Sequence, residues 1–337
     1  MKYIGIDLHS DNSFVAVIDE EDNLVYRKRL PNRLEEILAV IRRFGDEVAG
    51  IAVESTFNWY WLVDGLMGAG YKLHLVNTAA VKQYEGLKHG DDERDARHLA
   101  HLLRLGLLPV GYIYPKERRI WRDLMRKRMQ LVQDRSSHII QVQALVQRHL
   151  GGKLRGQAIK TLKHEEMERL GLPDKMNLAA GAHLAVIEVL TEEIECLENE
   201  VLGQVNEEAA FARLKTVPGI GVILGLTIWL EVGEIGRFAS PGNFASYCRC
   251  VSSTRISNGK QKGKGNSKNG NRYLAWAFVE AANYAVRYCK EAKAFYQRKK
   301  ARTNGVVAIK AVAHKLARAC YHMMRDDVPF EVERCFA

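Results

Sequence analysis

The chain begins with KYIGIDLHS at residues 2–10, an apolar run that carries one carboxylate, Asp7, near its end. Its aromatic and β-branched side chains pack well on a pleated, buried surface. Two further apolar runs follow at residues 13–19 and 24–30, joined by turn-forming residues at 20–23. This pattern predicts three strands in a meander, with Asp7 projecting from the first. Taken alone, Asp7 is better explained as a polar residue at the end of a strand, so any catalytic role for it has to be inferred together with the other acids.

The rest of the N-terminal third alternates between helical and strand patterns. The expected elements are a helix at 33–44, a strand at 50–54, a helix at 59–67, a strand at 72–77 and a helix at 91–105. A meander followed by such an alternation is the ribonuclease-H-like arrangement. We therefore predict an α/β, RNase H-like (RuvC-like) domain at residues 1–114.

Four carboxylates are expected to converge in this domain. Asp7 and Glu54 end two strands that the predicted order places side by side. Asp92 and Asp95 are spaced i,i+3 and so share one face of the later helix. Clustered like charges repel unless a cation neutralises them. Two Mg2+ ions about 3.5–4 Å apart would neutralise them and activate a nucleophile, so we predict a two-ion site, with Mn2+ as a substitute.

Neighbouring titratable residues are predicted to lie outside this site. Asp91 and Glu93 would point away from the shared face of the helix. His98 and His101 are also spaced i,i+3, but two histidines without a third ligand are a weak zinc signal. We predict that both histidines are exposed.

The middle of the chain carries two long amphipathic patterns, at residues 116–149 and 179–205. Together they predict a helical coiled-coil arm over residues 115–207. An ordinary packed helix pair would explain the apolar stripes, but not the arginines that line the first helix. The arm is therefore predicted to serve dimerisation and contact with a nucleic-acid backbone. The candidate contacts are Arg118, Arg119, Arg122 and Arg126.

The last third is predicted to be a mostly helical domain at residues 208–337. It opens with VPGIG at 217–221, ahead of an apolar helical run. A turn of this kind is typical of helix-hairpin-helix modules, in which Gly219 and Gly221 would let the backbone hold a DNA phosphate. A nucleotide P-loop is disfavoured, because no Gly-Lys-Ser/Thr follows.

Residues 250–272 form the most unusual stretch, dominated by glycine, lysine and asparagine. Such a composition cannot pack a core, so we predict a loop. A flexible basic linker would have this composition too, but linkers seldom interrupt a compact domain. The loop presents Ser257 among cations, a setting that suits a serine nucleophile receiving a phosphate. The predicted nucleic-acid contacts here are Arg255, Lys260, Lys262, Lys264, Lys268 and Arg272.

Bulk composition narrows the class of protein. The net charge of +10 and the isoelectric point near 9.2 favour a polyanionic partner. No apolar run approaches about 18 residues, so no membrane span is expected. We expect no secretion signal, and six irregularly spaced cysteines favour reduced thiols in a cytoplasm.

Taken together, these motifs give the chain a family resemblance. It resembles the DEDD-type insertion-sequence transposases, the bridge-RNA-guided serine recombinases related to the Piv invertase, in the branch with a Ser-Asn-Gly-Lys block. The resemblance runs from Met1 to about Tyr288. The motifs that carry it are Gly5-Ile6-Asp7, Val53-Glu54-Ser55, Asp92-Glu93-Arg94-Asp95-Ala96, Val217-Pro218-Gly219-Ile220-Gly221, Ser257-Asn258-Gly259 and Gly270-Asn271-Arg272-Tyr273-Leu274.

The resemblance implies a prokaryotic transposase that excises and integrates a mobile element by strand exchange. It implies that Mg2+ is bound by the four acids and that Ser257 attacks DNA to form a phosphoserine linkage. The partners implied are donor and target DNA, a structured guide (bridge) RNA, and further copies of the chain. These copies would form a dimer or tetramer with composite active sites. Ser252 stands where the family usually has proline, and Ser253 is the second candidate nucleophile.

Three other functions remain open at this point. A RuvC-like, structure-specific DNA endonuclease would keep the four acids and use water as the nucleophile. A sugar-kinase-like ATPase also begins with a strand and an aspartate, but the basic loop fits it poorly. A non-enzymatic nucleic-acid scaffold would need neither the acids nor the serine.

Overall fold

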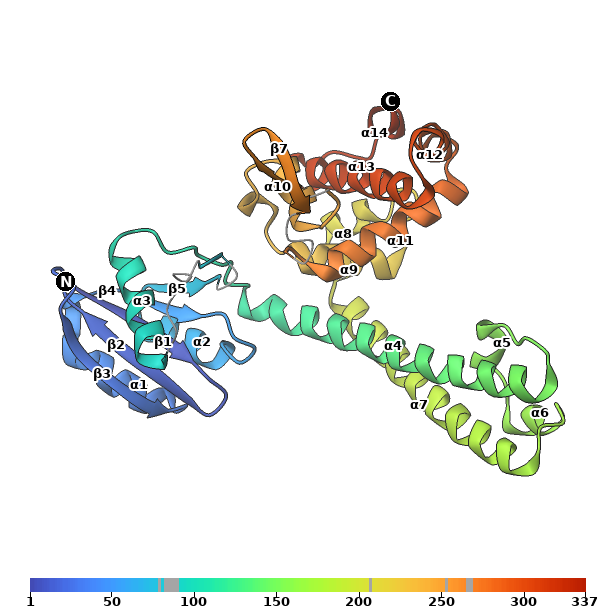
Figure 1. The fold of residues 1–337 in the computed structure, drawn as a ribbon, viewed down its shortest axis with the longest axis horizontal. Coiled ribbons are helices and arrows are strands. Elements are labelled where there is room, and N and C mark those ends of the chain that lie inside the picture. The colour runs from blue at the N-terminus through green and yellow to red at the C-terminus, as the bar shows by residue number, and fades with distance from the viewer. Residues whose placement is uncertain (78–79, 82–90, 206–207, 252–253, 265–268) are drawn as a thin grey trace. The chain divides into compact units, whose positions relative to one another are not determined.

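The computed structural model describes residues 1–337 except 78–79, 82–90, 206–207, 252–253 and 265–268. The chain forms two compact units, Met1–Lys116 and Glu117–Ala337 (Figure 1). Each unit is described separately below.

The first unit is built on a five-stranded mixed sheet with strand order β3-β2-β1-β4-β5. The meander strands pair antiparallel, and β4 and β5 run parallel to β1. This arrangement is consistent with an RNase H-like domain. The strands are β1 (Lys2–Leu8), β2 (Asn12–Ile18), β3 (Leu24–Pro31), β4 (Val48–Glu54) and β5 (Leu73–Val76).

Helices cover both faces of this sheet, and the period-2 alternation of each strand decides what lies under them. Ile4 and Ile6 of β1 face one core cluster, which also contains buried side chains of α1 and α2. The intervening Gly5 and the following Asp7 face the opposite side, where α3 packs on β1 and β2. The helices are α1 (Leu34–Ile41), the 3-10 helix η1 (Arg42–Glu47), α2 (Tyr60–Gly68) and α3 (Asp92–Arg104).

The second unit begins with a pair of long helices, α4 (Lys116–Leu150) and α7 (Asp174–Val205). They run antiparallel side by side, because Arg128 pairs with Glu198 while His138, further along α4, contacts His183 (Figure 1). Their distal ends share an apolar cluster with the connection between them. That connection carries two short helices, α5 (Gly156–Lys160) and α6 (His164–Glu168), where the sequence predicted only a polar link.

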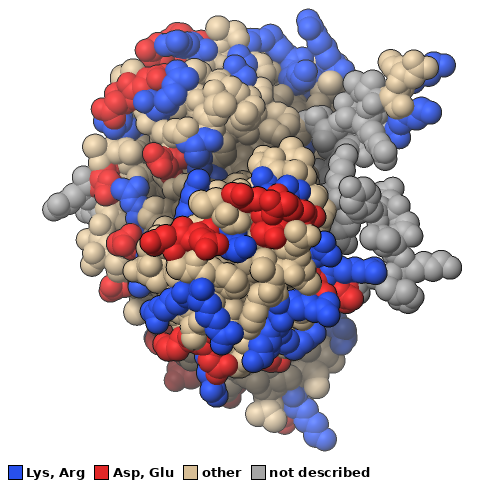
Figure 2. All heavy atoms as spheres, turned by 90° about the vertical axis from the view of Figure 1, so that its left-hand side faces the viewer, with Lys and Arg blue, Asp and Glu red and all other residues tan. Residues whose placement is uncertain are grey.

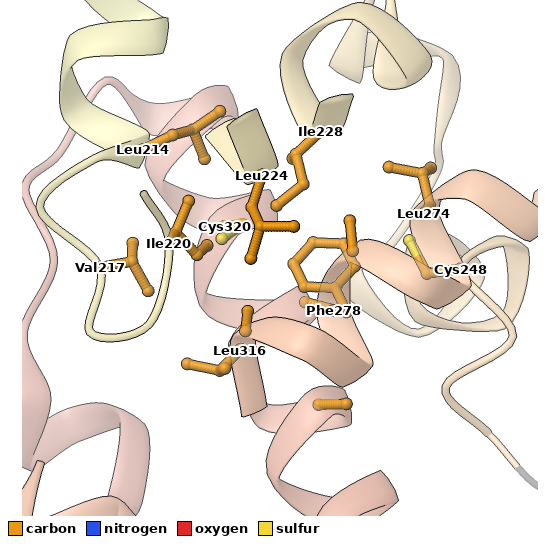
Figure 3. Packing of buried hydrophobic residues seen from close by; sticks show 14 of the residues in the cluster. Leu214, Val217, Ile220, Leu224, Ile228, Cys248, Leu274, Phe278, Leu316 and Cys320 are labelled. Carbon is orange, nitrogen blue, oxygen red and sulfur yellow. The ribbon is translucent and has the colours of Figure 1, made fainter. Parts of the chain in front are cut away.

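The rest of the second unit is mostly helical. Its largest apolar cluster gathers side chains from α8, α9, α10, α11 and α13, among them Leu224, Phe278 and Leu316 (Figure 3). Its elements are α8 (Ala209–Leu214), α9 (Val222–Val232), the 3-10 helix η3 (Ile235–Arg237), α10 (Pro241–Tyr247), β6 (Thr254–Ser257), β7 (Lys260–Lys264), α11 (Arg272–Tyr288), α12 (Lys290–Arg302), α13 (Gly305–Asp326) and α14 (Val332–Phe336).

The prediction of a loop over residues 250–272 is wrong for its centre, which forms a β-hairpin. Strands β6 and β7 pair antiparallel, with Ser257 opposite Lys260. The two residues between them, Asn258 and Gly259, both have positive φ angles, of 51° and 70°. A two-residue turn of this kind matches the twist of paired strands, and Asn-Gly is its preferred sequence. The turn signal therefore outweighed the composition.

The structure bears on two expectations drawn from composition, the lack of a membrane span and the net positive charge. None of the helices in the described ranges is both long and apolar enough to cross a membrane. On the face drawn in Figure 2, acidic and basic side chains lie interspersed, and neither sign covers that face alone. The net positive charge therefore does not form one uniform patch on that face.

Candidate active site

Helix α3 packs directly onto the backbone of strand β1. A Cβ atom on Gly5 would lie 1.9 Å from the carbonyl oxygen of Ala96 and 2.8 Å from the backbone nitrogen of Ala100. Only glycine lets the two backbones approach this closely. Sequence patterns do not indicate this requirement, because Gly5 stands in an otherwise ordinary buried strand.

The strands place Asp7 and Glu54 beside each other on the α3 side of the sheet. β1 and β4 run parallel with Ile6 opposite Val53, so the next residue of each strand is one of the two acids. Asp7 is only 3% exposed, and Glu54 is half-buried. The predicted adjacency of these two strand ends is confirmed.

The first turn of α3 adds Asp92 and Asp95 to this pair. Asp95 is close enough to Asp7 and Asp92 to feel their charges, and Glu54 feels those of Asp7 and Asp95. The four predicted acids therefore gather at one end of the sheet, which we call the acid cluster. Their catalytic role remains a prediction.

The acid cluster raises the pKa of two of its members. Burial, followed by a hydrogen bond and charge repulsion with Asp7, raises the pKa of Glu54 to about 7. Burial, followed by repulsion from Asp7 and Asp92, also raises the pKa of Asp95. Carboxyls held together in this way retain protons unless a cation neutralises them.

Asp92 is the exception, because two basic side chains hold it. Its carboxylate lies 2.6 Å from the Arg29 guanidinium and 3.3 Å from His9 Nε2, which also lies 3.2 Å from Asp7. Burial opposes ionisation of Asp92, but the hydrogen bonds from Arg29 and His9 lower its pKa. Neither basic residue was predicted. For His9 the available signal is its spacing, two residues beyond Asp7.

The donor atoms of the cluster suit a divalent cation. Carboxylate oxygens are the preferred protein ligands of Mg2+ and also suit Mn2+. Within the described residues, ligand atoms of Asp7, His9 and Asp92 lie within 4.8 Å of one another, close enough to hold one ion. Burial and repulsion within the cluster raise the pKa values of Glu54 and Asp95, and a bound cation would offset both effects. The residues therefore fit a divalent metal, and occupancy by two ions stays a prediction.

The residues flanking the cluster have structural partners. Asp91 caps α3 by accepting a 2.8 Å hydrogen bond from the backbone nitrogen of Arg94, and Glu93 pairs with Arg27 of β3. The prediction that His98 and His101 are exposed is wrong, since both are half-buried. His101 Nδ1 lies 2.8 Å from Asp22, and this contact ties α3 to the turn between β2 and β3. For His101, this contact with a residue distant in the sequence explains why the local helical pattern gave the wrong exposure.

The arginines of α4 divide into exposed and internal groups. Arg118 is exposed, and its guanidinium lies 5.0 Å from the ring centroid of Trp229. Arg119 and Arg122 are only 4% and 9% exposed. Arg126 is bound by Glu231, as described below. Arg126 keeps 32% of its side chain exposed. These three arginines are less accessible than Arg118, and their contact with nucleic acid stays a prediction.

Glu231 organises a buried polar network that was not predicted. Its carboxylate accepts two hydrogen bonds from Arg126, of 2.6 and 2.7 Å, and a third of 2.6 Å from Asn271 Nδ2. Asn271 also caps the start of α11. The network therefore joins the first part of α4 to α9 and to the start of α11. The sequence signal that could have indicated this network is Glu231 itself, the one acid in the otherwise apolar sequence of α9.

The glycines of the 217–221 turn have different roles. A Cβ atom on Gly219 would lie 2.2 Å from the carbonyl oxygen of Ala281, so this glycine permits close packing on α11. This packing gives Gly219 a structural reason, and its contact with a DNA phosphate stays a prediction. Gly221 precedes α9 and has open space around it, so it remains a predicted phosphate contact.

The serine hairpin, residues 254–264, presents Ser257 to solvent. Ser257, Lys260 and Lys262 are all exposed, and so is Arg272 at the start of α11. Arg255 and Lys264 belong to the two strands of this hairpin. Ser253 and Lys268 lie outside the described residues. The nucleophilic role of Ser257 and the nucleic-acid contacts of this region remain predictions.

Two family models match the chain. The first covers the DEDD transposases of IS110 elements, is described as a transposase, and matches residues 4–150. The second is described as the transposase IS116/IS110/IS902 family and matches residues 211–297. The two matched regions together span more than half of the chain, and they include the acid cluster and the serine hairpin.

Similar proteins come from several bacteria. A putative transposase, y4qE, of Sinorhizobium fredii is 25% identical over 292 residues, which is 85% of this chain and 72% of the relative. The transposase for insertion sequence element IS1111A of Coxiella burnetii is 23% identical, over 86% of this chain and 79% of the relative. The transposase for insertion sequence element IS1328 of Yersinia enterocolitica is 24% identical, over 83% and 82%.

Proposed function

This chain belongs to the IS110/IS1111 family of DEDD transposases, which are DNA-processing enzymes, and we propose that it excises and integrates its insertion sequence by metal-dependent, serine-mediated strand exchange. The acid cluster is the single observation that carries the proposal. Four carboxylates from two strand ends and one helix converge, and two of them have raised pKa values. Such a cluster is costly as a purely structural feature and is useful as a cation site.

In the proposed reaction, Asp7, Glu54, Asp92 and Asp95 hold the divalent ions. When bound, Mg2+ or Mn2+ would stabilise charge on the phosphate and on the leaving oxygen. The protein's own contribution is to orient the carboxylates through the rigid sheet and the closely packed α3. The His9 and Arg29 side chains compensate the charge of Asp92, which leaves it ionised.

Ser257 is the proposed nucleophile. Its hydroxyl oxygen would attack the phosphorus of a DNA phosphodiester, so that one Oγ–P bond forms while one P–O bond to the neighbouring deoxyribose breaks. The hydroxyl proton ends on the leaving oxygen, and the DNA stays attached as a phosphoserine. The exposed Lys260 and Lys262 of the same hairpin supply the cationic setting that such a step needs.

The proposed partners are those of the family resemblance. Donor and target DNA follow from the transposase family. A structured bridge RNA that guides the choice of target, and a dimer or tetramer that combines acids and serine from different subunits, are proposals. The exposed cations Arg118, Lys260, Lys262 and Arg272 are the described candidates for phosphate contacts.

Trapping a covalent DNA–protein adduct tests the proposal. The full chain would be incubated with labelled element-end DNA, Mg2+ and RNA transcribed from the flanking non-coding DNA, then denatured, digested and mapped by mass spectrometry. We expect a phosphoserine at Ser257, no adduct with Ser257→Ala or Asp7→Asn, and an adduct with Ser253→Ala. An adduct that survives in Ser257→Ala but not in Ser253→Ala would move the nucleophile to Ser253.

A second function has one observation in its favour. Asn258-Gly259 makes a favourable hairpin turn, so the sequence around Ser257 has a structural explanation that needs no catalysis. The alternative is a RuvC-like endonuclease in which the same metal site activates water. A Ser257→Ala protein that cuts DNA at the wild-type rate without an adduct would favour this alternative.

A further inference from the structure

A cavity of about 330 Å3 lies in the last part of the chain, beyond the family-model match at residues 211–297. One face of α13 lines it on one side, and residues 328–335 line the other. We call it the C-terminal pocket. The side chains that define it are His314, Lys315, Arg318, Met323, Phe330 and Arg334.

The charge of the C-terminal pocket is positive. Lys315, Arg318 and Arg334 line it, against a single acid, Glu331. Lys315 is already engaged, since it donates to a backbone carbonyl at 3.1 Å and lies over the Phe295 ring. Arg318 and Arg334 are exposed, and neither forms an ion pair within the described part of the chain. Two guanidinium groups are therefore available at the rim, and guanidinium is the side chain best shaped to bind phosphate.

The inner wall of the pocket is apolar. Met323 is buried, and Val328 and Phe330 are half-buried. The accessible part of this wall comes from Val328 and Phe330, because Met323 and Cys335 are only 3% and 8% exposed. Nucleobases stack on aromatic and apolar side chains in this way when they are unpaired, whereas the bases of a duplex are covered by their neighbours. A cavity of about 330 Å3 has room for one nucleotide but not for a double helix.

We propose that the C-terminal pocket binds one unpaired nucleotide of a nucleic-acid strand. The base packs against Val328 and Phe330, and Arg318 and Arg334 bind the adjoining phosphates. An acidic peptide would satisfy the arginines but would leave the apolar wall without a matching group. The inference rests on the chain being a transposase, and it does not depend on the nucleophile or on the metal site.

A binding titration tests the inference. Fluorescently labelled 12-nucleotide DNA and RNA single strands of one sequence, and the matching DNA duplex, would be titrated into the full chain without divalent metal. Arg318→Glu should weaken binding of at least one single strand about tenfold, since it removes one charge-assisted phosphate contact and adds a repulsive charge. Duplex binding should change no more than twofold. The strand that loses more affinity identifies the ligand as DNA or RNA.

Arg302→Glu is the matched control, because it makes the same charge change at an exposed position of α12 outside the pocket. A neutral variant, Ala319→Leu, would fill part of the pocket and should weaken the same single strand. Equal losses for Arg318→Glu and Arg302→Glu would overturn the inference, as would a larger loss on duplex than on single strands. Efficient displacement of the bound strand by a poly-glutamate peptide would also overturn it.

Discussion

Replacing Gly5 by alanine tests how the acid cluster is assembled. The new Cβ atom would lie 1.9 Å from the Ala96 carbonyl oxygen, whereas ordinary contact begins at 3.4 Å, so α3 has to retreat by about 1.5 Å. The strand cannot yield instead, because β1 is paired with β2 on one side and β4 on the other. Asp92 and Asp95 stand on the first turn of the same helix and move with it.

The magnitude follows from this displacement. Inserting a methyl group into a tightly packed contact costs about 1–3 kcal/mol of folding free energy. A displacement of about 1 Å at a reacting centre can cost roughly 100-fold in rate. Mg2+ is especially demanding, since it requires near-ideal octahedral geometry. We therefore expect Gly5→Ala to remain folded but to lose about 100-fold in metal-dependent DNA cleavage.

The assays are denaturant unfolding, Mn2+ binding by calorimetry and cleavage of element-end DNA. Gly203→Ala is the matched control, because Gly203 lies within α7 with nothing within 4 Å of the added atom. Helix propensity predicts that this control is neutral or gains up to about 1 kcal/mol. The reasoning is refuted if Gly5→Ala binds Mn2+ and cleaves DNA like the control.

Three further predictions concern charged groups. Glu231→Gln should lower the free energy of unfolding by about 2 kcal/mol, because it removes the charge from a buried acid that binds the half-buried Arg126 guanidinium. The exposed Glu234→Gln should change it by less than about 0.5 kcal/mol in urea titrations. Arg29→Ala should tighten Mn2+ binding in calorimetry, because the Arg29 guanidinium competes with the cation for Asp92. Arg27→Ala is the control and should leave the Mn2+ affinity unchanged, because Arg27 pairs with Glu93 instead. The pKa of Glu54 is raised to about 7 from an ordinary 4.5, so the metal-free protein should lose stability as the pH rises from about 4.5 through 7. Mg2+ should remove that loss in thermal unfolding. A metal-free stability that rises over this pH range would contradict the raised pKa of Glu54.

The N-terminal sheet and its acids could be predicted because their signals are local and periodic. The apolar runs fixed the strands, and their order indicated which strand ends would be neighbours. Asp7 and Glu54 were expected side by side because they end those two strands. Helical spacing placed Asp92 and Asp95 on one face of a helix. These predictions did not require knowing which residues far apart in the sequence contact each other.

The exposure of the arginines in α4 could not be predicted in this way. The amphipathic pattern of α4 indicates which residues share a face, but not which part of that face is covered by the rest of the chain. Glu231, more than a hundred residues away, turns Arg126 into an internal partner. Gly5 and Gly219 are similar cases, since the helix backbone that each one contacts comes from a later part of the chain.

Local signals were therefore enough to predict the strands, the long helices, the convergence of the four acids and the family resemblance. Three features depend on contacts that these signals do not contain: which cations are exposed, which glycines pack against a helix, and that residues 254–264 form a hairpin with Ser257 beside its turn. The difference lies in the range of the interactions. Periodicity and turn preference act over a few residues, whereas burial and charge pairing depend on contacts between segments far apart in the chain.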